Sequence, residues 1–273
     1  MPHEEAAVEH VKHQAHELPN LITLLHENFE HAPVVQFLHQ WENILFSLVA
    51  ISLLGMLALG GAKANRLIPE GVQNLFEAIV EGITGFVTGI LGEQGEKHVP
   101  FLGTLFLYIL FMNWIGLVPL MKSPTSAWST TIAVGLITMF YVQITGIREQ
   151  GFFNYLKHVA GNPSNGFGIV LIPLMLVLNI ILEFGAVPFS LSLRLFANVS
   201  SEDRLLFNFA SLDVARPFLP LFFQLFANVL AIIFSMVQAF VFMLLSTVYL
   251  SLVMPHGDHK HEDHGEAAGH PAH

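Results

Sequence analysis

The feature that most constrains the fold is a series of apolar runs, each long enough to cross a lipid bilayer as a helix. A spanning helix needs about 18 to 20 predominantly apolar residues. Runs of this length occupy residues 41–61, 101–121, 130–147, 169–199 and 217–254. Hydrophobic residues make up 53% of the chain and charged residues only 12%. The sequence therefore predicts an all-α polytopic membrane protein with about five transmembrane helices.

The last two runs are longer than a direct crossing of the membrane requires. At about 1.5 Å per residue, residues 217–254 would extend over about 50 Å or more, against a hydrocarbon core of about 30 Å. Such a helix must tilt strongly or break, and Pro173 and Pro188 favour kinks in residues 169–199. We expect these two helices to form a long and strongly tilted hairpin.

Residues 69–97 carry a different pattern. Glu70, Glu77 and Glu81 are placed among apolar residues, so no long apolar run forms. This pattern suits an amphipathic helix or hairpin at the membrane surface better than a full span. We expect an interfacial amphipathic hairpin here.

The two ends of the chain are polar and rich in histidine. Of the 15 histidines, seven precede Trp41 and six follow Met254. We expect a His-rich N-terminal segment over residues 1–39, a membrane domain over 40–254, and a disordered His-rich tail over 255–273. The tail could bind Zn²⁺ or Ni²⁺ loosely, but a solvated tail is the simpler interpretation. The N-terminus lacks the basic and apolar regions of a signal peptide, so the first span is expected to direct insertion.

Lysine and arginine positions predict the orientation. With the N-terminus outside, six basic residues lie inside and four outside, a weak positive-inside bias. The inside set is Lys63, Arg66, Lys97, Arg148, Lys157 and Lys260, and the outside set is Lys12, Lys122, Arg204 and Arg216. We therefore expect the N-terminus outside and the C-terminus in the cytoplasm. Because no transit peptide is visible, we expect a multi-pass protein of a bacterial plasma (inner) membrane and not of an organelle.

Several classes of site are excluded or discounted. The chain has no cysteine, so it has no disulfide or thiolate site. It has no phosphate-binding loop of the G-x-x-x-x-G-K-[ST] type, and we expect no cofactor, no nucleic acid and no ATP chemistry on this chain. His26 and His31 resemble a zinc-protease motif, but they are five residues apart and miss one helix face. We expect no metal site.

One arginine lies deep inside an apolar region. Arg194 follows the run that contains Glu183, eleven residues earlier, so the two side chains lie about 16 Å apart on a helix and cannot touch. A charge at mid-bilayer costs from about 2.5 kcal/mol to more than 10 kcal/mol, so it must face protein, water or an opposite charge. Arginine stays protonated and is a poor proton carrier, but it is a good fixed electrostatic gate. We expect Arg194 to meet a carboxylate on another chain.

Polar residues recur on one face of each of the last two helices. The first set is Asn179, Glu183, Ser190, Arg194, Asn198 and Glu202, and the second is Gln224, Asn228, Ser235, Gln238 and Ser246. Two facing polar stripes predict a buried hydrated path, in which Glu183, Glu202 and Asp203 exchange protons through water. The alternative is that these groups only hydrogen-bond the helices together.

At these residues the chain resembles subunit a of the F-type ATP synthase. The segment "SLSLRLFAN", 190–198, matches the family's hallmark around its essential arginine, which falls on Arg194. The segment "QAFVFMLLSTVYLSL", 238–252, resembles the last-helix signature, with Gln238 at the position that faces the arginine. "FMNWIGLVP" and "SPTSAWSTT" resemble the middle spans, and the resemblance covers roughly residues 33–254.

This resemblance implies a proton-translocating stator beside a ring of small hairpin c subunits, each with one membrane carboxylate, and beside peripheral-stalk b subunits. Two offset half-channels would meet the ring on either side of Arg194. The path residues would be Glu183, Ser190, Asn198, Glu202, Asp203, Gln238, Asn179, Ser235 and Asn228. The subunit would be non-catalytic on its own and would translocate H⁺, with Na⁺ left open because the ring supplies most of the ion ligands.

The chain also departs from the family pattern. Ala127 and Ser129 stand where the family usually has Asp and Asn, and Ala231 stands where a carboxylate or histidine is common. Asp203 occupies a position that often holds glutamate or histidine, and Arg204 is an addition. Two other classes of membrane protein would need features that are not visible in this sequence. A stand-alone ion-coupled transporter predicts an internal repeat, and an intramembrane hydrolase needs a zinc motif or a nucleophile with a base; the sequence shows neither.

Overall fold

The computed structural model describes residues 20–28, 33–63, 71–118, 120–159, 166–210 and 218–254. The His-rich stretches 1–19 and 255–273 lie outside the described residues. Within the described ranges every regular element is helical, which confirms the all-α prediction. The elements are α2 (Leu21–Asn28), α3 (Pro33–Gln40), α4 (Glu42–Lys63), α5 (Val72–Leu91), η1 (Glu93–His98), α6 (Val99–Ile115), η2 (Pro124–Ser126), α7 (Trp128–Gln150), α8 (Phe152–Val159), α9 (Gly166–Ile180), η3 (Ile181–Ala186), α10 (Val187–Ala210) and α11 (Phe218–Val253).

Six helical segments are long and apolar enough to cross a membrane, so the fold is that of a polytopic membrane protein. They are Glu42–Gly60, Gln73–Leu91, Glu93–Ile115, Trp128–Gln150, Ile172–Leu205 and Phe222–Val253. Five of them correspond to the five predicted spans. The sixth, within α5, falls in the region that the sequence assigns to the membrane surface.

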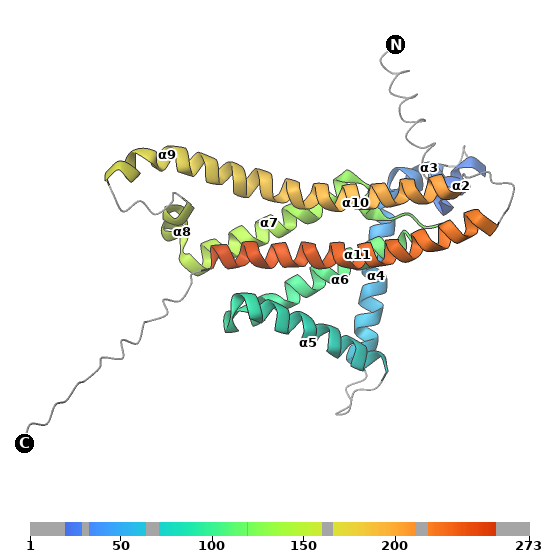
Figure 1. Cartoon of the computed structure of the whole chain (residues 1–273), viewed down its shortest axis with the longest axis horizontal. Helices are drawn as coiled ribbons and strands as arrows, with labels where there is room; N and C mark the ends of the chain where they lie inside the picture. Colours follow the sequence, from blue (N-terminus) through green and yellow to red (C-terminus); the bar gives the residue numbers. More distant parts are fainter. Residues whose placement is uncertain are drawn as a thin grey trace, which may run out of the picture.

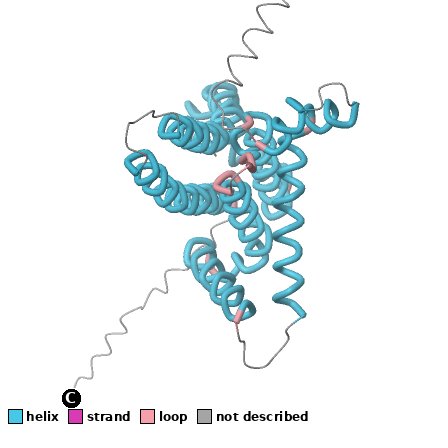
Figure 2. The backbone as a smooth tube through the Cα atoms, turned by 90° about the vertical axis from the view of Figure 1, so that its right-hand side faces the viewer, coloured by secondary structure: helices cyan, strands magenta, loops and turns pink. Residues whose placement is uncertain are grey.

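Residues 72–91 form the single helix α5, not the helical hairpin expected there. Its 20 residues meet the length needed for a span, and its glutamates Glu77 and Glu81 are exposed. Helix α5 starts beside the lower end of α4 and runs away from it at a steep angle (Figure 1; Figure 2). Helix α5 thus lies across the bundle and not alongside α4. An interfacial helix would have the same steep angle to a spanning helix.

The last two helical segments are the long hairpin that the sequence predicts. The 36-residue α11 is about 54 Å long at 1.5 Å per residue. It runs beside α10, and both cross α4 at a steep angle (Figure 1). Because this length exceeds a hydrocarbon core of about 30 Å, both helices must tilt if α4 crosses the membrane.

Helix α6 ends at Ile115, six residues before the predicted end of the second span at residue 121. The N–H of Gly116 donates to the carbonyl of Asn113 at 3.2 Å, and the chain then turns back toward η2. A Cβ on Gly116 would lie 2.6 Å from the Cβ of Ser123, so this turn requires glycine. The apolar residues after Ile115 therefore belong to the turn and not to the helix.

The core lies where α6, α7, α10 and α11 meet. Leu102 and Ile109 of α6, Leu195 of α10, and Phe242 and Leu250 of α11 are all fully or almost fully buried. Many other large apolar side chains on α4, α9 and α11 are exposed, as expected of a surface that faces lipid. This core fixes α10, the helix that carries Arg194, against α7 and α11.

Candidate functional site

Helix α10 presents Arg194 on its exposed face. The opposite face is apolar, with Leu191, Leu195 and Val199 buried at intervals of four residues, and it packs on α7 and α11. Ser190 lies one turn before Arg194 and is exposed as well. The packing of α10 therefore directs the guanidinium away from the protein core.

Arg194 has no ionic partner among the residues that the structure describes. No hydrogen bond or ion pair in the described ranges involves its guanidinium. On a helix, Glu202 is eight residues and about 12 Å further along, beyond direct reach. Arg194 therefore presents an uncompensated positive charge at the surface of the chain.

The predicted pair of facing polar stripes is only partly present. On α11, Ser235 and Gln238 are buried and Asn228 is half-buried. On α10, in contrast, Ser190 and Arg194 are exposed. The apolar face of α10 takes the contact with its neighbours, and the hydrated path between the two stripes stays a prediction.

Three buried polar atoms of α11 are unsatisfied within the described residues: Oε1 of Gln224, Oγ of Ser235 and Nε2 of Gln238. The Oγ of Ser235, which is 1% exposed, and the Nε2 of Gln238, which is 7% exposed, have no hydrogen-bond partner among the described residues. Native proteins pair almost all such groups with protein or ordered water. Leaving one unpaired costs about 1–3 kcal/mol, so these positions are suited to water or to a polar group of another chain.

A π-helical segment, η3, interrupts the long helix directly before α10. The backbone N–H of Val187 donates to the carbonyl of Leu182, five residues earlier. Pro188 follows directly, and because it has no N–H it cannot make the regular bond to the carbonyl of Phe184. Wide turns of this kind occur frequently at functional sites. The interruption lies between Pro173 and Pro188, the two prolines at which kinks are expected.

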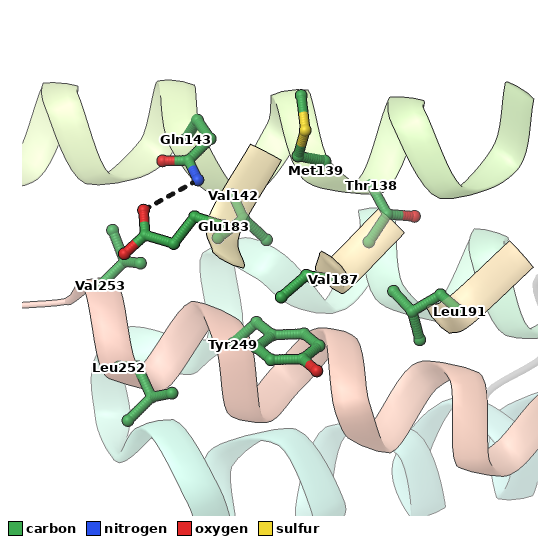
Figure 3. Close-up of a pocket in the computed structure, with 10 residues that line it drawn as sticks. All are labelled: Thr138, Met139, Val142, Gln143, Glu183, Val187, Leu191, Tyr249, Leu252 and Val253. Atoms are coloured by element: carbon green, nitrogen blue, oxygen red, sulfur yellow. Dashed lines mark hydrogen bonds between the residues drawn. The ribbon is translucent and has the colours of Figure 1, made fainter. Parts of the chain in front are cut away.

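Within η3, Glu183 is turned toward α7 and α8. Its neighbours Leu182 and Phe184 are exposed, whereas Glu183 is half-buried. The Nε2 of Gln143 on α7 donates to Glu183 Oε2 at 3.2 Å (Figure 3). The hydroxyl of Tyr155 on α8 donates to the same oxygen at 3.1 Å. Two donors from two different helices therefore hold one carboxylate oxygen.

Tyr155 is buried in this arrangement. Burial raises its pKa, and so do the charge of Glu183 and the hydrogen bond to it. Its hydroxyl also donates to Oε1 of Gln143, so its one proton is shared between Gln143 and Glu183. The phenol therefore stays neutral and keeps its proton for hydrogen bonding.

A small cavity of about 60 Å³ adjoins Glu183. Figure 3 shows it between α7, α10 and α11, with Thr138 and Gln143 above and Tyr249 below. Most of its lining is apolar, but Thr138, Gln143, Glu183 and Tyr249 supply polar groups. Since about 10–15 Å³ suffices for one water molecule, the space has room for water beside these groups. Glu183 is thus placed where it can exchange protons with water.

The other predicted acids lie further along α10. Asn198, Glu202 and Asp203 are all half-buried. Asn179 is also half-buried, but its Nδ2 donates to the carbonyl of Val159 at 2.6 Å and so ties α9 to α8. The acids therefore flank Arg194 on both sides along the helix, with Glu183 before it and Glu202 and Asp203 after it.

The sequence analysis did not identify the partners of Glu183. Gln143 is the one amide within residues 130–147, a signal that could have singled it out. Tyr155 carries no such signal, because it lies in a polar loop segment 28 residues from Glu183. The ring of His98, also buried, bonds the Tyr141 hydroxyl through Nδ1 at 2.8 Å. Within the described ranges no group of three or more His, Asp or Glu side chains could hold a metal ion.

Fold and site together define a polytopic membrane protein with an exposed arginine on a long helix and carboxylates on either side of it. Comparison with known proteins identifies the group more closely. The family model of the ATP synthase A chain matches residues 44–251, so the chain belongs to this family.

Individual relatives of the chain belong to the same family. The chain is 42% identical over 253 residues to ATP synthase subunit a of Protochlamydia amoebophila, covering 91% of this chain and 93% of the relative. It is 36% identical over 218 residues to ATP synthase subunit a of Helicobacter acinonychis, and equally to that of Helicobacter pylori strain 26695. Those two matches cover 78% of this chain and 89% of each relative.

Proposed function

We propose that this chain is the proton-translocating stator subunit of a rotary F-type ATP synthase. The observation that carries the proposal is Arg194. It lies on the exposed face of α10, and in the described part of the chain it has no ionic partner. A membrane protein tolerates such a charge when an acid on another chain meets it. In the family to which the chain belongs, that acid is the carboxylate of each small ring subunit.

The acids on either side of Arg194 support two offset half-channels. Glu183 lies before it, beside a cavity that can hold water, and Glu202 and Asp203 lie after it. Ser190 and Asn198 flank the arginine by one turn each, and they share its helix with the acids. Protons would enter from one side, load a ring carboxylate, and leave through the other side after the ring turns.

Arg194 then acts as a fixed charge and not as a proton carrier. Because arginine stays protonated, it does not pass a proton from one half-channel to the other. A ring carboxylate that approaches it must lose its proton first and gains one beyond it. The unsatisfied Gln238 and Ser235 of α11 would hydrogen-bond water or the ring in this region, with Asn228 and Asn179 further out.

The remaining parts of the proposal follow from the same role. The subunit is non-catalytic on its own, and the ATP chemistry takes place on soluble subunits of the complex. Its partners are the c-subunit ring, the peripheral-stalk b subunits and the lipid bilayer. It lies in a bacterial plasma membrane with its N-terminus outside and its C-terminus inside, and it translocates H⁺.

Site-directed crosslinking tests whether the Arg194 face meets the ring. The chain has no cysteine, so a single introduced cysteine is unique in it. Ser190→Cys places a thiol on the exposed face, and Ser192→Cys places one two residues later at a position that is 1% exposed. Each variant is labelled with a maleimide–benzophenone reagent in the purified complex and irradiated.

The proposal predicts a photoproduct between Ser190→Cys and the small carboxylate-bearing subunit, and none from Ser192→Cys. The crosslinked complex should also lose ATP-driven rotation, because the stator is then tied to the ring. A Ser190→Cys variant that crosslinks only to lipid, in a complex with its ring attached, contradicts the proposal.

A further inference from the structure

We propose that Tyr155 is a positioning residue that holds the Glu183 carboxylate for proton exchange with the adjacent cavity. The inference rests on the proposed proton path and assigns a role to a residue of α8, outside the membrane-spanning helices. It is carried by the hydrogen bonds at Glu183, by the anchoring of α8 and by the irregular backbone of η3.

The two carboxylate oxygens of Glu183 differ in their hydrogen bonds. Oε2 of Glu183 accepts from Tyr155 at 3.1 Å and from Gln143 at 3.2 Å. Oε1 accepts no hydrogen bond from the described residues. With Oε2 held by two donors, Oε1 is the oxygen left to bind and release protons. Proton transfer needs donor and acceptor within about 2.6–3.2 Å, so a fixed carboxylate exchanges more readily than a mobile one.

Tyr155 is itself firmly placed. Its ring is 7% exposed and lies against Gly146 of α7, where an added Cβ would be 3.0 Å from the tyrosine Cε2. At the start of α8, Gly151 has φ of 77° and its carbonyl accepts the Tyr155 N–H at 2.9 Å. At the other end, the side chain of Asn179 donates to the carbonyl of Val159 at 2.6 Å. The Gly151 N–H also donates to the carbonyl of Ile147 of α7 at 2.9 Å, so the start of α8 is tied to α7 and its end to α9.

Glu183 needs this outside support because its own backbone segment is irregular. The π-helical turn of η3 aims Glu183 inward while Leu182 and Phe184 point outward. A functional side chain must be held within about 0.5 Å of its working geometry by the groups around it. Here those groups come from α7 and α8, and not from the helix that carries the acid.

In this proposal Tyr155 orients the Glu183 carboxylate and does not itself relay protons. Burial, together with the charge of Glu183 and its hydrogen bond, raises the pKa of Tyr155, so the phenol keeps its proton. Its one hydroxyl proton is shared between Glu183 Oε2 and Oε1 of the uncharged Gln143, whose Nε2 in turn donates to Glu183, so Tyr155 holds the carboxylate both directly and through this amide. On α11 the nearest titratable side chain of the cavity is Tyr249, and Figure 3 shows its hydroxyl directed away from Glu183.

The test is a double-mutant cycle in the intact complex. Wild type, Tyr155→Phe, Glu183→Gln and the double variant are compared in inverted membrane vesicles at matched content of ring and soluble sector. The initial rate of ATP-driven proton pumping is measured. Tyr155→Phe keeps the ring and its packing and removes only the hydroxyl. The control is Tyr141→Phe, which removes a hydroxyl of a half-buried tyrosine bonded to His98 at 2.8 Å, away from Glu183.

We expect Tyr155→Phe to lower the pumping rate about tenfold, the effect of losing one hydrogen bond to a charged group. The double variant should pump no more slowly than Glu183→Gln alone, because Tyr155 acts only through Glu183. Tyr141→Phe should pump like wild type. A Tyr155→Phe defect that adds fully to that of Glu183→Gln overturns the proposal, since the tyrosine would then be only structural.

A second variant covers the case in which Tyr155→Phe fails to assemble. Site-specific replacement of Tyr155 by 3,5-difluorotyrosine keeps the ring and the donor and makes the phenol more acidic. We expect normal pumping at neutral pH and an upper pH limit that moves down relative to wild type. An unmoved pH limit overturns the positioning role. If Tyr155→Phe pumps normally while Glu183→Gln does not, the positioning role fails and the proposed function stands.

Discussion

The contact between α7 and α10 gives a prediction that can be worked out from the structure. Gly135 of α7 is buried against Ser192 and Pro188 of α10. A Cβ added at Gly135 would lie 2.3 Å from the Ser192 Oγ and 2.9 Å from the Pro188 carbonyl oxygen. The serine hydroxyl can rotate away, although it would give up its 2.7 Å bond to the Pro188 carbonyl. The backbone oxygen cannot move, so Gly135→Ala must push the two helices apart.

The magnitude follows from two opposing effects. Overpacking of a tight contact costs about 1–3 kcal/mol. Replacing glycine by alanine inside a helix returns about 1 kcal/mol through helix propensity. We therefore expect Gly135→Ala to destabilise the protein by up to about 2 kcal/mol. Because Arg194 is two residues past Ser192 on the same helix, the shift should also displace the guanidinium and lower the pumping rate.

The assay is thermal unfolding of the detergent-solubilised complex, together with ATP-driven proton pumping in vesicles. The matched control is Gly85→Ala on α5, where an added Cβ meets nothing within 4 Å. This control should be as stable as wild type or slightly more stable, and should pump normally. If Gly135→Ala melts at the same temperature as Gly85→Ala and pumps at the full rate, the close α7–α10 contact described above is refuted.

Three further predictions concern buried polar groups and the α8 connection. Thr125 is fully buried, and its hydroxyl donates to Asn113 Oδ1 and bonds Ser123 Oγ, both at 2.7 Å. Thr125→Val should therefore destabilise the folded protein by about 1–3 kcal/mol, and an unchanged melting temperature would contradict this. The pKa of Tyr155 is raised above its ordinary value of 10.0, so its contribution to stability is complete below pH 10 and is lost as the pH rises further. The stability difference between wild type and Tyr155→Phe should thus be equal at pH 7 and pH 9, and a smaller difference at pH 9 would contradict the assignment. Gly151 has φ of 77° and ψ of 148°, a conformation open essentially to glycine alone. Gly151→Ala should therefore lower the melting temperature and, by displacing Tyr155, weaken proton pumping. Full pumping by this variant would count against a link between Gly151 and Tyr155.

Sequence reasoning predicted the spans well because each depends on local composition. The runs that correspond to α4, α7 and α11 were placed to within three residues at each end. The end of α6 was placed six residues too late, because the turn after Ile115 is also apolar and hydropathy cannot separate the two. The single helix α5 was expected as a hairpin, since its scattered glutamates resemble an interrupted pattern.

The candidate site was predictable in part. A lone arginine in an apolar run is visible in the sequence, so Arg194 and the acids around it could be named. The partners of Glu183 could not, because Gln143 and Tyr155 are 40 and 28 residues away and meet it only through tertiary packing. The outward direction of Arg194 is in line with the expectation that it meets another chain, but the face on which α10 packs could not be assigned. Helical spacing groups residues on one face, but it does not say which face packs against a neighbour.

The measurement that tests the central claim most directly is ATP-driven proton pumping by Arg194→Ala in inverted vesicles, with and without Na⁺. The ring and soluble sector must be present in wild-type amounts, and Arg204→Ala, which changes another exposed arginine of α10, is the matched control. The account predicts that Arg194→Ala abolishes pumping and lets protons leak passively through the membrane sector, while Arg204→Ala pumps. Normal pumping by a fully assembled Arg194→Ala complex would contradict it.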